Sequence, residues 1–508
     1  MLIDYPHQQA KEHDLAIYRQ VVPQNHFLVR LLDTIDWDSF LPLLLPLYRE
    51  DMGRPVEPPL IMLKLEYLRY HHNLSDREVI SRAETDLAYR EFLQVPLSFR
   101  LPHPTSLCRF RGRLGVDGFS KIFDAVVAAA REKGFVKDRL RIKDATHVIG
   151  NMAVPTALAL VAQTRDKLLE SARPFAPEMV EGELANLEQL RKNTESFKPA
   201  ERLVTRLSQL KEMLIWCDEL TPPENAETHR PWQAFLAQRD LAHKILNDKE
   251  NPSGDRTIST TDPDARCGKH GVFFDGYMVD ILVDADSEIV TQINVLGAMG
   301  DEATDTLVLI KQEEAAHRND IAAVSIDGVG FNGPLLRELE DPNGLNIDAY
   351  VPVPAEPEKF FGPNDFQENE AGGVTCPAEK LSTQKSHDKQ KQTTKHVFPA
   401  SACSGCPLLA QCMGKAPKGR KGRTVNKSDY KAEHQRARAK AKTSAYKTIR
   451  QDHYKVERKL GEIMNRHGGR RARYRGRKKV LIQQLMATLA TNVKRIVRLE
   501  CAQTAANC

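Results

Sequence analysis

The sequence predicts a mixed α/β protein, in which a core of alternating strands and helices is joined to all-helical regions. Three observations predict this class. Short runs of β-branched and apolar residues lie between 139 and 355, apolar residues recur at helical spacing before 135 and within 157–250, and the chain is basic and helical after 425. At 508 residues the chain is too long for one compact core, so several domains are expected.

Residues 1–135 are predicted to form a helical DNA-binding domain. Ser75 and Glu78 have the spacing of a capping box, and a second helix start is predicted at Thr105-Ser106. The basic helix that follows makes the pair similar to a helix-turn-helix arrangement. Surface arginines on an ordinary helical bundle are the alternative interpretation. The side chains predicted to contact DNA here are Arg109, Arg111 and Arg113.

The α/β core is predicted from residues 136–156, 265–355 and 440–500. Strands are expected at RLRIKDATHVIG, GYMVDILVD, EIVTQINVL, DIAAVSID and NIDAYVPVP, and helices at ATDTLVLIKQEEAAHR and GPLLRELED. This series gives an α/β layer rather than a bundle or a sandwich. Residues 157–264 return mainly to helical spacing and are interpreted as an insertion.

Residues 356–425 are polar, show little periodicity and are predicted to be a mobile connector. Four cysteines within it have metal-ligand spacing, because Cys403 and Cys406 form a Cys-x-x-Cys pair with Cys376 and Cys412 on either side. They predict a small insertion ordered by structural Zn²⁺. Four unlinked thiols are the alternative, although a flexible linker offers no core in which cysteine would be buried.

The net charge of +5 hides a basic block. Between Lys415 and Lys479 there are 24 Lys and Arg against 5 Asp and Glu, which is +19. Such a block predicts a nucleic-acid partner, with a solvated charged helix as the alternative. The arginines expected to contact the DNA backbone are Arg470, Arg471, Arg473, Arg475 and Arg477.

No membrane partner is expected. No stretch approaches the roughly 20 apolar residues of a membrane span, and the amino-terminal residues lack the layout of a signal peptide. Nine cysteines in a long chain also favour reduced thiols over a disulfide framework. The expected location is the cytoplasm, in association with the nucleoid.

Three carboxylates are candidates for a metal centre. Asp144 lies within the first predicted strand, Asp327 ends another strand just before Gly328, and Glu457 lies in the basic helix HYKVERKLGEIM. Phosphodiester cleavage by a pair of Mg²⁺ ions needs such a cluster, because carboxylates are the hard ligands that Mg²⁺ prefers. An Asp at a strand end is also an ordinary turn residue, so composition alone does not select these three.

Longer stretches resemble bacterial insertion-sequence transposases. GRPVEPPLIMLKLEYLRY, LSDREVISRAETDLAYREFL and HPTSLCRFRGRL resemble the helical amino-terminal domain of this large group. TTDPDARCGKHGVFFDGYMVDILVD, SIDGVGFNG and VERKLGEIMNRHGGRRARYRGRKKV, with the closing NVKRI, resemble its catalytic domain. The resemblance covers most of the chain, excepting parts of the helical insertion and of the connector.

The resemblance implies an RNase H-like catalytic core of the DDE class. Its acids stand on the first strand, the fourth strand and a late helix, which correspond to Asp144, Asp327 and Glu457. It further implies Mg²⁺ or Mn²⁺, two ions per site, and a cysteine cluster before the glutamate helix. Double-stranded DNA is the implied partner, at the element ends and at the target, with a homodimer in the DNA complex.

The sequence departs from the family around the glutamate. Related enzymes carry a Tyr, an Arg and a Lys where this chain has Arg450, His453 and Met464. Either Arg450, Lys459 and Arg466 contact phosphate instead, or this copy is impaired. Glu462 is the competing acid if the register on the helix differs. Asp262, Asp264 and Arg266 also match the family, and they either orient the site or form an ordinary loop.

The leading functional hypothesis is a transposase that cuts the ends of its element and joins the freed 3′-hydroxyls to a new site. A catalytically impaired, transposase-derived DNA-binding protein is the main alternative. A metal-dependent nuclease without strand transfer would use the same residues and differ only in its products.

Overall fold

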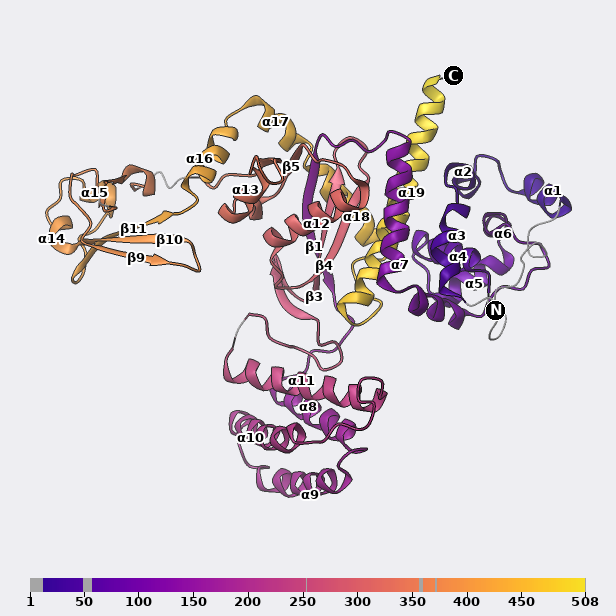
Figure 1. Cartoon of the computed structure of the whole chain (residues 1–508), viewed down its shortest axis with the longest axis horizontal. Helices are drawn as coiled ribbons and strands as arrows, with labels where there is room; N and C mark the ends of the chain where they lie inside the picture. The colour runs from indigo at the N-terminus through magenta and orange to yellow at the C-terminus, as the bar shows by residue number, and fades with distance from the viewer. Residues whose placement is uncertain (1–11, 49–56, 253, 356–359, 371, 508) are drawn as a thin grey trace.

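The computed structural model describes residues 12–48, 57–252, 254–355, 360–370 and 372–507. It confirms the mixed α/β class. A sheet with packed helices lies at the centre of Figure 1, with amino-terminal helices on one side and a small, separate sheet on the other. Four further helices, α8 to α11, lie below the central sheet in this view.

The amino-terminal region is helical, and the capping box is confirmed, since Ser75 Oγ accepts from the backbone N–H of Glu78. The second helix start was misplaced, because His103 is the N-cap of a helix that begins at Pro104. That helix continues to Glu132 across a kink at Gly115, where φ is 63°. The elements are α1 (Glu12–Val21), α2 (Phe27–Thr34), η2 (Asp38–Phe40), α3 (Leu41–Leu44), η3 (Leu45–Leu47), α4 (Pro59–His71), α5 (Asp76–Thr85), α6 (Leu87–Leu93) and α7 (Pro104–Glu132).

The central sheet has the strand order β2-β3-β1-β5-β6, and β4 also pairs with β3. β1 runs antiparallel to β3 and parallel to β5, and β5 runs parallel to β6. The five predicted strands are present, while β2 was not predicted. The strands are β1 (Arg141–Ile149), β2 (Arg266–His270), β3 (Val272–Asp284), β4 (Val290–Gly297), β5 (Ala323–Ser325) and β6 (Asp348–Tyr350).

Period-two alternation divides the sheet into two covered faces. Ile142 and Val148 of β1 share one core with Val279 of β3 and with apolar residues of α7, α18 (Tyr454–Arg466) and α19 (Arg477–Asn507). On the other face, Leu282 packs with residues of α12 (Glu302–His317) and α13 (Gly333–Leu339). Asp144 belongs by alternation to the face of Ile142, which is the face that α18 covers.

The residues of β1 on the opposite face carry buried charge. The Arg141 guanidinium is fully buried and donates to Glu313 of α12 at 2.7 Å and to Asp284 of β3 at 2.8 Å. Lys143, also fully buried, lies 3.1 Å from Asp280 and 3.5 Å from Glu302. These ion pairs tie β1 to β3 and to α12.

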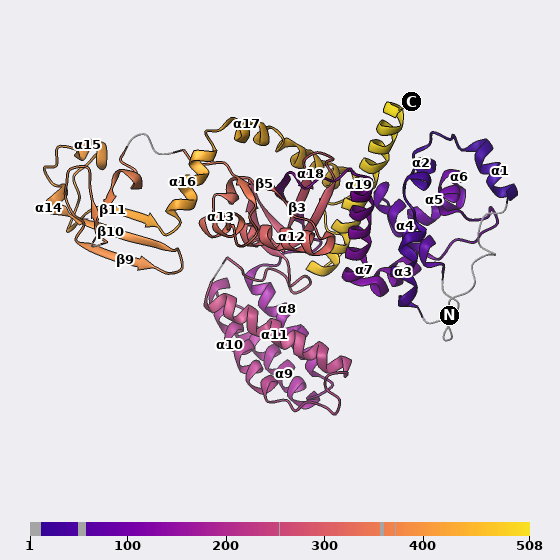
Figure 2. The ribbon, with the colours of Figure 1, turned by 45° about the horizontal axis from the view of Figure 1, so that its top comes forward.

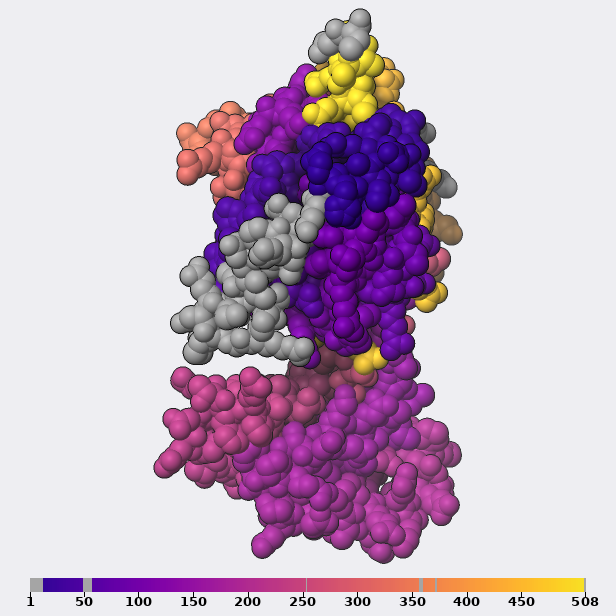
Figure 3. Space-filling view, turned by 90° about the vertical axis from the view of Figure 1, so that its right-hand side faces the viewer, coloured from indigo at the N-terminus to yellow at the C-terminus, as the bar shows by residue number. Residues whose placement is uncertain are grey.

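The segment between β1 and β2 contains four helices with a hydrophobic core of their own. Leu168, Leu214, Phe235 and Ile245 are among its buried residues. In the side view of Figure 3 these helices form a lower body beneath the amino-terminal helices. They are α8 (Ala157–Ala172), α9 (Pro177–Asn193), α10 (Pro199–Asp218) and α11 (Arg230–Glu250).

The predicted mobile connector is in large part folded, which corrects the sequence-based expectation. β9, β10 and β11 form an antiparallel sheet around a core of Phe366, Val374, Phe398 and Val425. Such a small core, with the exposed polar strand β9, produces little alternation in the sequence. The elements are η5 (Pro363–Asp365), β7 (Gln367–Glu368), β8 (Val374–Thr375), β9 (Gln384–Asp388), β10 (Thr393–Pro399), α14 (Ala400–Cys403), α15 (Leu409–Cys412) and β11 (Lys421–Ser428).

The carboxy-terminal region returns to the central sheet through α16 (Lys431–Lys440), α17 (Ser444–Gln451), α18 and α19. Figures 1 and 2 both show α19, in yellow, beside α7 and next to the sheet. One side of α19 is apolar, and its Val480, Leu485, Val493 and Ile496 are buried in the main core. The Asn492 side chain also accepts from the backbone N–H of Val290 and donates to its carbonyl oxygen.

Replacing Arg141 by alanine is expected to lower the free energy of unfolding by about 3–5 kcal/mol, because Asp284 would remain as an unpaired buried charge and Glu313 would keep only Arg131 as its cationic partner. Arg139→Ala is the matched control, since the Arg139 side chain is 53% exposed and pairs with Asp286 near the surface. That change should cost about 0–1 kcal/mol. Urea denaturation followed by circular dichroism measures both, and equal losses would contradict the role given to Arg141.

Candidate active site

The three candidate carboxylates stand on β1, after β5 and on α18. Asp144 lies in the middle of β1, half-buried, opposite Ile281 of β3. Asp327 follows β5, which is the parallel neighbour of β1, and its side chain accepts from the backbone N–H of Val329 as the N-cap of η4 (Gly328–Gly330). Glu457 lies in the first turn of α18, a helix that packs on β1, and its side chain is exposed.

The three carboxylates affect one another electrostatically. The pKa of Asp144 is raised from 3.8 to about 7, chiefly by burial, with the charges of Asp327 and Glu457 adding to the rise and the Ala145 N–H and Lys143 opposing it. Asp144 therefore lies in a partly buried region of excess negative charge. A cation would relieve this repulsion.

Arg450 of α17 is the cation that lies beside this group. Its guanidinium donates to the carbonyl oxygen of Ile326 at 2.8 Å and to Ser325 Oγ at 3.1 Å, at the end of β5. Burial lowers the pKa of Arg450, while Asp327, Asp144 and Glu457 are among the neighbours that raise it. His453 is buried beside Arg450 and Ser325, and burial lowers its pKa to about 4, so it is neutral at pH 7.

The other departures from the family have structural explanations. Met464 is 2% exposed and packs in the main core, so a cation at this position would be buried. Glu462 accepts from Lys494 at 2.6 Å and lies 3.5 Å from Lys459, an ion cluster between α18 and α19. Glu462 is thus neutralised locally, which favours Glu457 as the third acid.

The Asp-Pro-Asp segment holds the start of α19. Asp262 is fully buried and accepts from the Tyr277 hydroxyl at 2.5 Å and from the backbone N–H of Gly476 at 3.0 Å. Asp264 accepts from the backbone N–H of Arg477, whereas Arg266 pairs with Asp255. The contacts of Asp262 and Asp264 join this segment to the start of α19, so it has a positioning role in the fold beyond that of an ordinary loop. Tyr277 was not singled out, because a tyrosine in a predicted strand is more simply explained as a core residue.

The arginine-rich loop before α19 lies along β1. The backbones of Ile149 and Arg470 to Ala472 pair with one another, and the Arg470 guanidinium donates to the carbonyl oxygen of His147 and to Thr146 Oγ1. Arg473 is directed inward, to Leu74 O and Asn73, whereas Arg475 donates to Asn151 O and remains largely exposed. The side chains of Arg471 and Arg477 are exposed.

The other residues predicted to contact DNA differ in their exposure to solvent. Arg109, Arg113 and Arg466 are exposed, and Arg113 lies over the ring of Tyr48. Arg111 is 8% exposed and forms ion pairs with Glu66 and Asp76, which places it inside the helical domain. Lys459 is 5% exposed and faces Glu462. Arg111 and Lys459 therefore have structural partners and are poorly placed for phosphate.

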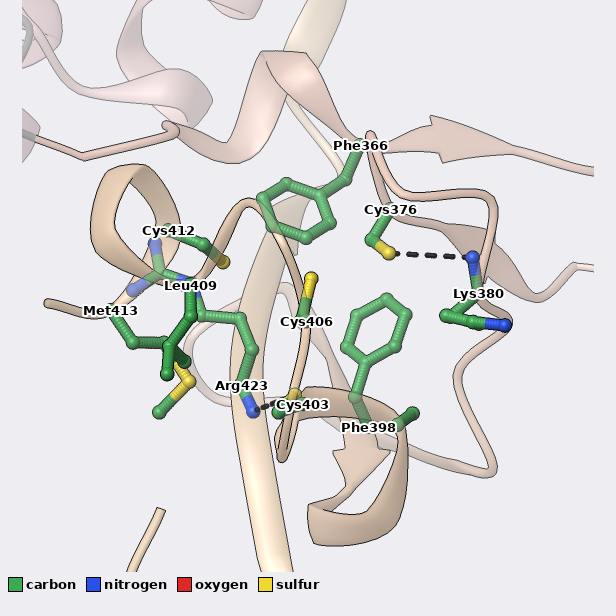
Figure 4. Close-up of a pocket in the computed structure, with 11 residues that line it drawn as sticks. Phe366, Cys376, Lys380, Phe398, Cys403, Cys406, Leu409, Cys412, Met413 and Arg423 are labelled. Atoms are coloured by element: carbon green, nitrogen blue, oxygen red, sulfur yellow. Dashed lines mark hydrogen bonds between the residues drawn. The ribbon is translucent and has the colours of Figure 1, made fainter. Parts of the chain in front are cut away.

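The four clustered cysteines line one small pocket. The structure has them as free thiols, and Figure 4 shows Cys376, Cys406 and Cys412 with their sulfurs directed into the space near Phe366 and Phe398. The backbone N–H groups of Lys380 and Arg423 donate to the sulfurs of Cys376 and Cys403, each at 3.4 Å. Burial raises the pKa of Cys412, and the other three thiols add to that rise.

Within the described ranges, no three or more His, Cys, Asp or Glu side chains are close enough as they stand to hold a metal ion. Both candidate centres would thus require side-chain rearrangement on binding. For the acids the supporting observation is the mutual repulsion at Asp144, and for the thiols it is their common pocket.

Two parts of the chain match family models. Residues 375–497 match a "Transposase DDE domain", which includes the cysteines, Glu457 and most of α19. Residues 16–113 match a "Transposase domain (DUF772)", which includes the helices α2 to α6. The protein "Uncharacterized protein ORF8 in nfe locus" from Rhizobium meliloti is 28% identical over 166 residues, covering 31% of this chain and 79% of that protein. No solved structure matches the chain.

The two family matches indicate a transposase. They indicate an insertion-sequence transposase of the DDE class, which at the general level is an enzyme that cleaves and moves DNA. The DDE family generally uses a divalent metal such as Mg²⁺, and its substrate is DNA. In the described part of the chain, no helix is both long and apolar enough to cross a membrane.

Proposed function

We propose that this protein binds the ends of an insertion sequence, cleaves them in a metal-dependent reaction and joins the freed 3′-hydroxyls to new DNA. The observation that carries this proposal is that the charges of Asp327 and Glu457 act on Asp144 and raise its pKa. In the sequence, Asp327 lies 183 residues after Asp144, and Glu457 lies 130 residues after Asp327. The family matches supply the reaction class.

The order of the strands supports an RNase H-like core. Along β4-β3-β1-β5-β6, β3 is antiparallel to both β4 and β1, and β5 and β6 are parallel to β1. Asp144 is then on the central strand and Asp327 follows the strand beside it. We extend this proposal to the domain division, with a catalytic domain from 136–156, 265–355 and 440–500 beside a helical domain (1–135), an insertion (157–264) and the cysteine-containing region (356–425).

Asp144, Asp327 and Glu457 would hold the two Mg²⁺ or Mn²⁺ ions, which when bound activate the attacking oxygen and stabilise the leaving one. The protein's own groups position the site. Arg450 fixes the end of β5 through Ile326 O and places a positive charge beside the acids. The arginine-rich loop holds the end of β1 through Arg470, and Asp262 holds the start of α19.

The catalytically impaired alternative has less support. It was raised by His453 and Met464, yet Met464 is a core residue and His453 is packed against Arg450. A nuclease without strand transfer uses the same acids and is distinguished by its products alone. The homodimer in the DNA complex and the cytoplasmic, nucleoid-associated location stay predictions.

We also propose that Cys376, Cys403, Cys406 and Cys412 bind one structural Zn²⁺. Cysteine thiolates are the ligands typical of closed zinc sites, and backbone N–H donors to sulfur, such as those of Lys380 and Arg423, stabilise thiolates. The surrounding core is small, so the ion would supply much of the stability of this region.

Asp144→Asn, Asp327→Asn and Glu457→Gln are each expected to lower the rate of end cleavage about a thousandfold or more, because a catalytic metal supplies several kcal/mol of transition-state stabilisation. The assay incubates purified protein with DNA carrying the element's ends and Mg²⁺, and separates cleaved and joined products. Glu462→Gln is the control and should retain cleavage. Loss in Glu462→Gln with retention in Glu457→Gln would reassign the third acid.

Replacing Arg471, Arg475 and Arg477 together by alanine should weaken DNA binding with little change in sequence preference. Each lost phosphate contact lowers the slope of log affinity against log salt by about one unit, so a loss of about three is expected. Arg173→Ala, which removes an exposed arginine paired with Glu181 on the helical insertion, is the control. An unchanged slope would show that the loop is only a solvated surface.

Elemental analysis should find one zinc per chain, and the double variant Cys403→Ser/Cys406→Ser should lose it. Cys217→Ser is the control, because Cys217 is buried in the separate core of the helical insertion. Chelation should also increase proteolysis within residues 360–428, since metal binding and folding are coupled. Zinc-free protein with a stable β9–β11 sheet would contradict the proposal.

A further inference from the structure

The tip of the β2–β3 hairpin exposes an aromatic side chain to solvent. Phe273 is 76% exposed, the highest fraction among the large apolar side chains of the described residues, and its neighbour Val272 is 64% exposed. The turn is made by Gly271, whose φ of 72° favours glycine. Lys269 pairs with Phe273 across the hairpin and places its Nζ 5.5 Å from the ring centroid.

The tip is held in place by its base. Phe274, the next residue, is buried with Ala145, Met278 and Ala298, and its ring lies 4.9 Å from that of His147 of β1. β2 and β3 are paired without interruption up to the turn. The exposure of Phe273 is therefore a property of an ordered hairpin, not of a frayed loop.

Strand register places Phe273 on the same face of the sheet as Asp144. Asp144 lies opposite Ile281, and opposed residues of paired strands share a face. Phe273 is eight residues before Ile281 on β3 and so has the same orientation by alternation. The packing of Phe274 and Met278 with Ala145 on the other face confirms that the alternation is kept across this stretch.

Cationic groups connect the carboxylates with the tip. Arg470 contacts Thr146, Arg471 pairs with Ile149 at the end of β1, and Arg475 reaches Asn151. The hairpin continues beyond this point, where Arg266 is paired with Asp255 and Asp275 lies on the face of Phe273, so Lys269 is the cation at the tip itself. A polyanion placed over Asp144 would meet the arginines of the loop first, and Lys269 with an aromatic ring at the end of the hairpin.

We infer that the hairpin tip, Lys269 to Phe273, contacts the bases of the bound DNA end, with Phe273 packed against a base and Lys269 on the adjacent phosphate. This inference rests on the proposed function. Eight residues of strand span roughly 27 Å at ~3.4 Å per residue, which equals roughly eight base pairs of duplex. The contact is thus expected roughly eight base pairs from the scissile phosphate. Apolar side chains at such positions insert at base steps or stack on unpaired bases.

The test measures the affinity of the full-length protein for its element-end DNA as a function of salt. Phe273→Ala should weaken binding roughly 5- to 150-fold with an unchanged salt slope, since a stacking contact releases no counterions, whereas Phe273→Trp should bind nearly as well as the wild type. Lys269→Ala should lower the slope by about one unit. Phe197→Ala, on the helical insertion, is the control for loss of an exposed phenylalanine and should have no effect.

Abasic substitutions along the DNA locate the contact. The effects of Phe273→Ala and of an abasic site should be non-additive only at one or two positions, roughly eight base pairs from the cleavage site. Wild-type protein that binds no element-end DNA would overturn the proposed function and this inference together. Wild-type binding with an unaffected Phe273→Ala would overturn the inference alone, and a dimer that dissociates in this variant without loss of DNA affinity would assign the tip to a protein contact instead.

Discussion

The charges that β1 carries into the centre of the sheet are the constraint on which the surrounding elements depend. A buried charge is tolerated only beside an opposite charge, and removing one partner is costly. Arg141 therefore requires Asp284 of β3 and Glu313 of α12, and Lys143 requires Asp280 and Glu302. These pairs fix β3 beside β1 and α12 against one face. Only the opposite face remains for α18, and Asp144 points to that face.

Asp144 differs from these charges, because no cation pairs with it among the contacts of the described residues. Its neighbours include two further acids, and the nearby cations Lys143 and Arg450 are already engaged, with Asp280 and with the end of β5. The buried carboxylates of Asp280 and Asp284 in the sheet and of Glu313 in α12 each have a cationic partner. Repulsion between like charges that the protein does not relieve with its own cations is typical of functional sites. It lowers the stability of the fold and favours the binding of a ligand of opposite charge.

Much of the fold could be predicted because the signals are local. The alternation around Asp144, the capping box at Ser75 and the apolar side of α19 each depend on residues that lie close together in the sequence. β2 and the β9–β11 sheet were not predicted, because exposed polar strands show no alternation. For the site, the sequence placed Asp144 and Asp327 on strands, but the engagement of Glu462 by Lys494 and the burial of Arg111 depend on contacts between distant segments, which local patterns do not encode.

The positions that depart from the family bear on the choice between the proposed enzyme and a relic that only binds DNA. A relic would need exposed arginines but no cluster of acids, and the cluster repels both DNA and its own members. None of the departures here replaces one of the three acids. Met464 fills the core beneath α18, and His453 packs against Arg450, which contacts the end of β5 beside Asp327. Arg450 thus stays beside Asp327, and the charges of Asp327 and Glu457 still act on Asp144, which is what the proposed catalytic role requires of these positions.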